Sequence, residues 1–195
     1  MIGSKPAIDT MDAIHARRSV RSYAPGKLDR ATIRTLLEAA VRAPTAMHQE
    51  PWAFVIVQDA ERLRRLSDRA KRFFVEETRR SHLDRGGHAI EMFERPEFNL
   101  FYDAGTLIVI CGNPAVPFVS ADCWLAAENL MLAAASMGLG TCVIGSAVSG
   151  LNSPESKSEL GIPADLSAIA PVIAGVPASA APVAPRKEPR ILAWK

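Results

Sequence analysis

The chain has 195 residues and a formal net charge of +2, with 48% hydrophobic and 23% charged residues. A single domain of this length can bury about 70% of its unfolded surface, and this balance of residues excludes an intrinsically disordered chain. The small net charge gives no electrostatic reason to expect a nucleic acid or a membrane surface as a partner.

Apolar residues recur along the chain in patterns typical of both helices and strands. Helical spacing predicts helices over residues 10–16, from 29 to the turn at 43–46, and over 61–81, 120–137 and 153–161. Short apolar runs predict strands at residues 53–57, 107–111, 141–145 and 168–176. Thr10, Asp59 and Ser153 can cap three of the helices, and Gly138 and Gly161 can end two. The mixture predicts one domain of both α and β structure.

Three segments depart from a regular framework within this single domain of residues 1–195. Residues 81–102 mix glycines and aromatics without a clear period, which predicts a mobile cap. Residues 120–137 are apolar on nearly all sides, which predicts a helix buried on every face and covered in part by another subunit. The tail, residues 177–195, is rich in proline and should run extended over this subunit or a neighbour.

Several kinds of site and location are not indicated by the sequence. Cys111, Cys123 and Cys142 lie far apart without a Cys-x-x-Cys pair, so they predict core thiols and neither a zinc site nor disulfides. The histidines share no metal-ligand spacing, so no metal site is expected. The first residues lack a signal-peptide pattern and no apolar stretch reaches the ~20 residues of a membrane span, so we expect a cytoplasmic protein.

Four segments together match the pattern of one family. They are RRSVR at 17–21, APTAMHQEPW at 43–52, GLGTCVIG at 138–145, and PRKEP at 185–189 ahead of Trp194. Each alone has an ordinary explanation, as charges at a helix end, a helix stop before a strand, or solubilising charges in a tail. In this order, and over nearly the whole chain, they resemble the nitroreductase-like family of FMN-dependent oxidoreductases.

The resemblance implies an α+β fold and a particular assembly. The sheet would be central and mainly antiparallel, flanked by helices, within an intertwined homodimer. FMN would lie between the subunits, and the helix over 120–137 would belong to the interface. The turn at Pro44, Thr45 and Ala46 would contact flavin held mainly by the other subunit, so each active site would be shared.

The charged candidates for FMN binding come from the first and last motifs. Arg17, Arg18 and Arg186 suit the phosphate, because guanidinium groups grip it better than ammonium groups do. Arg21 is the candidate for the flavin edge at N1 and O2, which gains negative charge on reduction.

The resemblance also assigns backbone contacts. Val143, Ile144 and Gly145 would pass the flavin, with the N–H of Ile144 or Gly145 directed at N5, the hydride-accepting atom. The other expected contacts are Ser19, Pro44, Thr45, Ala46, His48 and Lys187.

Two positions depart from the family pattern. His48 stands where the family commonly has Asn, and Glu50 where it commonly has Gln. A carboxylate beside an electron-rich flavin would disfavour reduction unless Glu50 faces solvent or pairs with His48 or an arginine.

The activity implied by the resemblance is a ping-pong reaction. NADH or NADPH would reduce FMN at N5 and leave, and an electron-poor acceptor such as a nitroaromatic, quinone or enone would take its place. Two alternatives keep the flavin: a relative specialised in reductive dehalogenation, dehydrogenation or flavin breakdown, and a non-catalytic flavin-binding module. A third is a flavin-free α/β domain.

Overall fold

The computed structural model describes residues 8–81, 88–182 and 185–195. Within these residues, four strands form one sheet in the order β1-β2-β4-β3, and all the neighbouring strands are antiparallel. The strands are β1 (Ala53–Val57), β2 (Thr106–Gly112), β3 (Gly140–Val143) and β4 (Ser167–Gly175). The four predicted strands and the antiparallel sheet implied by the resemblance are therefore confirmed, except that β3 ends at Val143 and Gly145 begins a short 3-10 helix, Gly145–Ala147.

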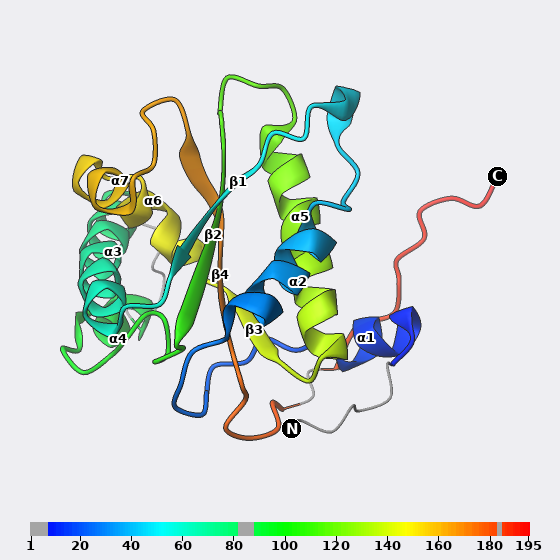
Figure 1. Cartoon of the computed structure of the whole chain (residues 1–195), viewed down its shortest axis with the longest axis horizontal. Helices are drawn as coiled ribbons and strands as arrows, with labels where there is room; N and C mark the ends of the chain where they lie inside the picture. Colours follow the sequence, from blue (N-terminus) through cyan, green and yellow to red (C-terminus); the bar gives the residue numbers. More distant parts are fainter. Residues whose placement is uncertain (1–7, 82–87, 183–184) are drawn as a thin grey trace.

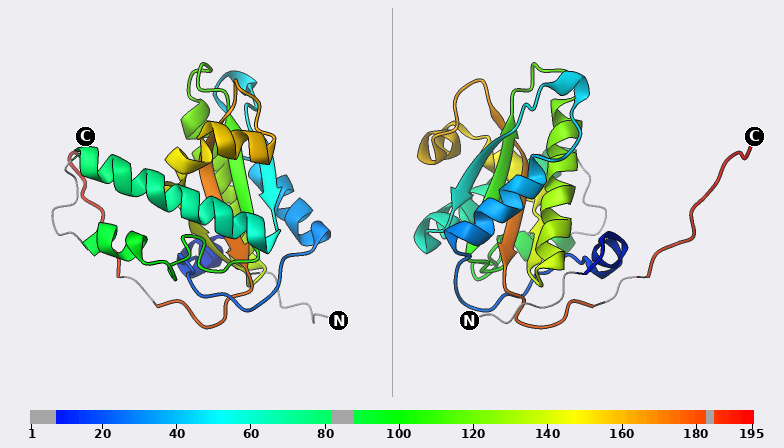
Figure 2. Two further views of the ribbon diagram at one scale, coloured as in Figure 1. Left: turned by 90° about the vertical axis from the view of Figure 1, so that its left-hand side faces the viewer. Right: turned by 45° about the vertical axis from the view of Figure 1, so that its right-hand side comes forward.

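Helices cover both faces of the sheet (Figures 1 and 2). One face carries α2 (Arg30–Ala40) and α5 (Val119–Ser136). The other carries α3 (Ala60–Ser81), α6 (Val148–Leu151) and α7 (Pro154–Leu160). The short helices α1 (Thr10–Ala16) and α4 (His88–Glu94) contact α5 and α3, respectively. The architecture is thus three layers, helix on sheet on helix.

Strand β2 supplies the core on both sides of the sheet, because successive side chains of a strand point to opposite faces. Leu107 and Val109 lie in the apolar cluster with α3, whereas Ile108 and Ile110 lie in the cluster with α2 and α5. All the residues of β2 are buried. This explains why its sequence is a continuous apolar run without polar alternation.

The helix ends follow local chemistry, with one correction. Asp59 and Ser153 each accept a backbone N–H of the first turn, at 2.8 and 3.2 Å, as predicted. Gly161 ends α7 in the left-handed region with φ of 67°. The prediction that Thr10 caps α1 is wrong, because Asp9 is the cap and Thr10 is already helical. A carboxylate at this place also interacts favourably with the positive end of the helix dipole.

Helix α5 is buried on one side within the chain. Ala126, Ala127 and Leu130 are fully buried against the sheet and its neighbours, but Trp124 and Leu125 are 40% and 45% exposed. Within the part of the chain that the structure describes, one side of the helix is therefore open, which is consistent with the prediction that another subunit covers part of it. The outer side of the helix carries apolar residues, and the rest of the described chain does not cover them.

The described part of the predicted cap packs into the core. Residues 82–87 of the 81–102 segment lie outside the described residues, and α4 follows them. The rings of Phe93 and Phe98 lie 5.5 Å apart between centroids, and those of Phe98 and Tyr102 lie 5.7 Å apart. Phe101, in the same segment, is fully buried. The described part of this segment is therefore packed beside α3.

The tail begins on the body of the molecule and then leaves it. The N–H of Ala178 donates to the carbonyl oxygen of Ser22 at 3.0 Å. Residues 185–195 are exposed, form no regular element, and extend away from the rest of the chain (Figure 1). Among all the helices in the described ranges, none has the length and apolar character needed to cross a bilayer.

Candidate functional site

The basic segment, residues 17–21, follows α1 directly and runs along the edge strand β3. The N–H of Val20 donates to the carbonyl oxygen of Thr141 at 2.9 Å, and Ser19 pairs with the same residue in a parallel bridge. A Cβ on Gly140 would lie 2.8 Å from the Val20 side chain, so a glycine is needed for this close approach. The segment therefore has a fixed position on the sheet.

The three arginines of the basic segment have different neighbours. Nε of Arg17 lies 3.4 Å from Oε1 of Glu128 on α5. The guanidinium of Arg18 turns back and donates to two carbonyl oxygens at the end of α1. The guanidinium carbon of Arg21 lies 5.9 Å from the centroid of the Tyr102 ring, a cation–π distance. Arg18 thus caps the C-terminal end of α1, while Arg17 and Arg21 contact side chains of other parts of the chain.

A cavity of about 400 Å³ opens beside the basic segment. Its lining includes Arg17, Arg18, Val20, Thr141 and residues 179–181 of the early tail. A smaller cavity of about 220 Å³, lined by Ser19, Arg21 and the same part of the tail, adjoins it. The larger cavity has the size of a small-molecule site.

The end of β3 offers one backbone N–H to a ligand. The N–H of Ile144 already donates to the carbonyl oxygen of Pro171 at 2.9 Å. Of the two N–H groups suggested by the resemblance, this leaves Gly145 as the candidate. Gly145 is exposed, and a Cβ built there would meet nothing within 4 Å. Val143, just before, is half-buried. A ligand can therefore approach this backbone from outside.

The 43–50 loop follows α2 and holds an unusual backbone. Met47, His48 and Glu50 have φ values of 56°, 53° and 43°. Left-handed backbone at a residue other than glycine costs about 1 to 3 kcal/mol and tends to occur at ligand sites. Pro44 and His48 are exposed, whereas Thr45 and Ala46 are half-buried. The loop is thus a strained and accessible surface.

Within one chain, the 43–50 loop and the tail residues Arg186 and Lys187 are separate from the basic segment. The basic segment borders the C-terminal end of α5, because Arg17 and Ala135 line the same cavity. The 43–50 loop lies beside the N-terminal end (Figure 1), and a helix of 18 residues spans about 27 Å. Arg186 and Lys187 lie in the exposed tail, beyond the tail residues that line this cavity. Within one chain the basic segment contacts residues 140–142 of β3, directly before the predicted contacts 143–145.

Buried ionisable groups beside the basic segment stay neutral. Burial raises the pKa of Cys142, although the nearby Arg21 acts to lower it. Burial also raises the pKa of Tyr23, with a smaller opposing effect from Arg21. Burial likewise raises the pKa of Cys111 to about 11 and that of Cys123 to about 12. All three cysteines are free and buried, as predicted, and such protonated thiols are poor nucleophiles.

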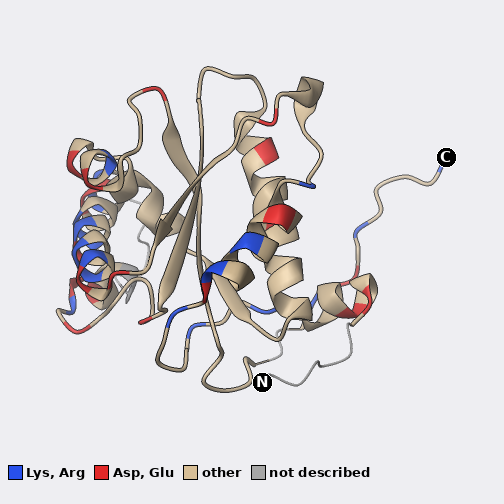
Figure 3. Ribbon diagram, viewed as in Figure 1, with Lys and Arg blue, Asp and Glu red and all other residues tan. Residues whose placement is uncertain are grey.

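The sequence reasoning did not single out Glu128 or Tyr102. The sequence did point to Glu128, since α5 is uncharged except at Asp122 and Glu128; Figure 3 draws acidic residues of this helix in red. A lone charge on an apolar helix indicates a specific partner. Tyr102 had no such signal, because only the fold brings the cap segment to Arg21. The described residues hold no group of three His, Cys, Asp or Glu side chains that could bind a metal ion.

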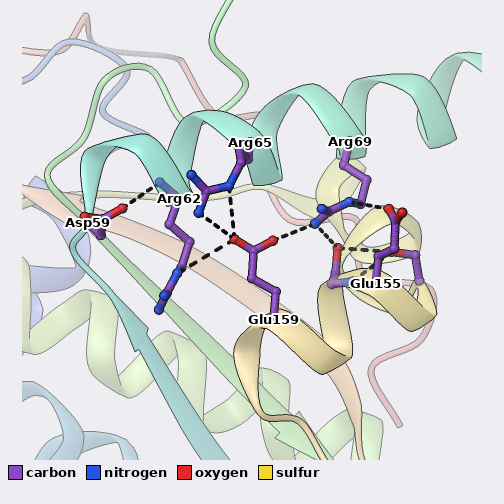
Figure 4. Close-up of polar contacts among 8 residues, drawn as sticks. Asp59, Arg62, Arg65, Arg69, Glu155 and Glu159 are labelled. Atoms are coloured by element: carbon purple, nitrogen blue, oxygen red, sulfur yellow. Dashed lines mark hydrogen bonds and ion pairs between the residues drawn. The ribbon is translucent and has the colours of Figure 1, made fainter.

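The basic face of α3 is occupied by α7. The carboxylate of Glu159 lies 3.0 Å from Arg65 and 3.1 Å from Arg69 (Figure 4). Arg69 also reaches Glu155 at 3.0 Å. Desolvation by burial acts to raise the pKa of Glu159, but hydrogen bonds from Arg69 and Arg65 outweigh it and lower that pKa overall. These charges tie two helices together.

Comparison with known proteins gives a consistent result. The model of the Nitroreductase family matches residues 14–175. A protein of Archaeoglobus fulgidus with the provisional name NADH dehydrogenase/NAD(P)H nitroreductase is 26% identical over 174 residues, covering 87% of this chain and 86% of that protein. The iodotyrosine deiodinase of Thermotoga neapolitana is 27% identical over 137 residues, covering 67% of this chain and 70% of that protein.

A solved structure shows the same similarity in three dimensions. The nitroreductase of Bacteroides fragilis, crystallised with bound FMN, superposes with a TM-score of 0.82 at 28% identity. The match covers 96% of this chain and 100% of that one.

Proposed function

The chain belongs to the Nitroreductase family, and we propose that it is an FMN-dependent oxidoreductase that takes electrons from NADH or NADPH. The proposed acceptor is an electron-poor small molecule such as a nitroaromatic, a quinone or an enone. One observation carries the proposal: the basic segment, the start of β3 and a cavity of about 400 Å³ lie together at the sheet edge. The similarity to an FMN-bound nitroreductase supports the choice of cofactor.

The residues at this edge fit a flavin mononucleotide chemically. Arg17 and Arg18 line the cavity, and guanidinium groups suit a phosphate that carries nearly two negative charges. The exposed backbone of Gly145 offers an N–H with open space around it. Cation and backbone donor thus lie on the same edge, as a ligand with one anionic and one polar end requires.

The chain's own groups set the electrostatic field. FMN, when bound, supplies the hydride-accepting and hydride-donating chemistry, so donor and acceptor use one site in turn. Arg21 contributes a positive charge that favours the uptake of negative charge nearby. Cys142 and Tyr23 stay protonated at neutral pH because burial raises the pKa of each. Neither of these two groups therefore offsets the Arg21 charge.

We further propose a homodimer in which the two halves of each site come from different subunits. Two-fold packing of α5 against its copy places the 43–50 loop of one subunit near the basic segment of the other. Exposed apolar side chains gather around this helix: Met11, Ile14, Met47, Phe118, Trp124, Leu125 and Met137. Such a surface is typical of an interface.

The tail fits the same assembly. Ile191, Leu192 and Trp194 are 61%, 83% and 89% exposed. Burial of three such side chains on a partner is favourable. A tail that crosses to the partner would bring Arg186 and Lys187 to a phosphate bound there.

The visible spectrum of the purified protein, followed by anaerobic mixing with each nicotinamide, tests the proposed function. We expect a flavin band that bleaches with NADH or NADPH and returns when a nitroaromatic or quinone is added. A colourless protein that binds no added FMN contradicts the proposal. A flavin band that neither nicotinamide bleaches indicates instead a non-catalytic flavin-binding module.

Reductive dehalogenation is a second candidate, because the chain is 27% identical to an iodotyrosine deiodinase over 67% of its length. Anaerobic oxidation of the reduced protein by a halogenated tyrosine, with release of halide, separates the two. Faster reoxidation by a nitroaromatic than by the halotyrosine supports the first proposal.

A further inference from the structure

A buried carboxylate connects the 43–50 loop to α5. Asp122 lies in the first turn of the helix and is 3% exposed. Its two carboxylate oxygens lie 3.2 and 3.3 Å from the backbone nitrogen of Ala46, whose N–H they accept. The two residues are 76 positions apart in the chain. The contact therefore fixes the loop against a different element of the fold.

Burying a charge for one backbone N–H is a costly way to stabilise a fold. Desolvation of a carboxylate is strongly unfavourable, and one hydrogen bond offsets only part of it. The N-terminal end of α5 helps, because the helix dipole favours a negative charge there. What Asp122 adds beyond this is a defined position for one loop residue.

That residue is the one at which the strained backbone begins. Met47 and His48, which follow Ala46 directly, both have left-handed φ values. Backbone of this kind persists only where the surroundings hold it. Anchoring the Ala46 amide holds the start of the turn, and with it the surface formed by Pro44, Thr45 and His48.

The second charge of α5 acts on the other half of the site. Glu128 pairs with Arg17 at 3.4 Å. The two carboxylates on this otherwise uncharged helix thus contact the 43–50 loop and the basic segment, respectively. The helix of the proposed interface sets the position of both halves.

We infer that Asp122 is a positioning residue that holds the 43–50 loop in the conformation that contacts the flavin. The inference rests on the proposed function. Asp122 itself does not touch the cofactor; it acts through the Ala46 amide.

The test compares Asp122→Ala and Asp122→Asn with the wild type, and uses Asp59→Ala as the matched control. Asp59 also accepts a backbone N–H at the start of a helix, on the opposite side of the sheet. We expect Asp122→Ala to weaken FMN binding about tenfold or more, because the half-buried Ala46 amide loses its acceptor. Asp122→Asn, whose side-chain oxygen still accepts the N–H, should stay within about threefold of the wild type.

Three measurements make the outcome decisive. The FMN dissociation constant is measured by fluorescence titration, stability by thermal unfolding, and the Ala46 contact by amide hydrogen exchange. Asp59→Ala should lower the unfolding temperature while leaving FMN affinity unchanged, which separates positioning from general destabilisation. Asp122→Ala should speed exchange at Ala46 even without flavin.

The inference is overturned if Asp122→Ala binds FMN as tightly as the wild type, or if Asp122→Asn is as weak as Asp122→Ala. Failure of the proposed function gives a different result, because the wild type then binds no FMN while exchange at Ala46 still reports the contact.

Discussion

The two helical layers of this molecule differ in how they meet their surroundings. On the α3 side, three arginines of one helix converge on Glu159 of another, and their charges are neutralised within the chain (Figure 4). On the α5 side, Trp124 and Leu125 stay exposed, and Phe118 at the start of the helix is 67% exposed. The first layer pairs the charges that face α7 within one chain, whereas the second presents an apolar surface.

The candidate site lies on the α5 side of the sheet. The basic segment, the 43–50 loop and the start of the tail all border α5. The charges of α3 that face α7 are already engaged. The comparison supports the proposal that the site lies on the α5 side of the sheet and is completed by a partner.

The largest effect is expected from a charge on the open side of α5. Leu125→Arg should prevent dimerisation and lower FMN affinity by about a hundredfold or more, because a buried unpaired charge costs several kcal/mol. Light scattering with flavin absorbance recorded across the same chromatographic peak measures both. Phe73→Arg, at a residue of α3 that is 38% exposed, is the control and should keep the dimer and the flavin. A folded Leu125→Arg monomer with stoichiometric FMN would falsify the shared site.

The next effect concerns the phosphate. Arg17→Ala and Arg186→Ala should each weaken FMN binding about tenfold or more, since a charge-assisted hydrogen bond contributes roughly 1.5 to 3 kcal/mol. Arg64→Ala, which removes a cation from α3, should leave the affinity unchanged. Fluorescence titration of the three variants gives the comparison, and wild-type affinity in both of the first two would remove the phosphate assignment.

A smaller effect on binding, but a distinct one on chemistry, is expected at Arg21. Arg21→Ala should lower the flavin midpoint potential and slow reduction by NADH or NADPH, while FMN affinity stays within about threefold. Spectroelectrochemical titration measures the potential. An unchanged potential would show that Arg21 does not act on the flavin.

The smallest effect on function is expected on the α3 side of the sheet. Glu159→Gln should lower the free energy of unfolding by about 1 kcal/mol at neutral pH and leave FMN affinity unchanged. Because folding lowers the pKa of Glu159 from its ordinary 4.5, its contribution is present above pH 4.5 and is lost as the pH falls through the folded value. Urea unfolding of both proteins across this range checks the sign. A difference that grows as the pH falls would contradict the account.

Much of the framework could be predicted from local sequence. The strands are apolar runs bounded by turn residues, and β2 is apolar throughout because both of its faces are buried. Asp59, Ser153 and Gly161 act within one helical turn, so their roles follow from the nearby sequence. The first and third motifs meet as the resemblance implies, through the bridge between Ser19 and Thr141.

What could not be predicted depends on distant partners. The Ile144 N–H is occupied by Pro171 on β4, which no local pattern shows. Tyr102 reaches Arg21 only through the fold of the cap segment. The sequence shows that α5 is apolar on most sides, but not which of its residues, such as Trp124 and Leu125, the chain itself leaves exposed.

The central claim is that each flavin site combines the basic segment of one subunit with the 43–50 loop of the other. The most direct test is a heterodimer of Arg17→Ala and Ala46→Trp, purified through two different tags. Each homodimer should hold little flavin, because one half of both its sites is impaired. The heterodimer pairs an intact basic segment with an intact loop at one of its two sites. The account predicts about half the flavin content of the wild type, and a heterodimer as empty as both homodimers would contradict it.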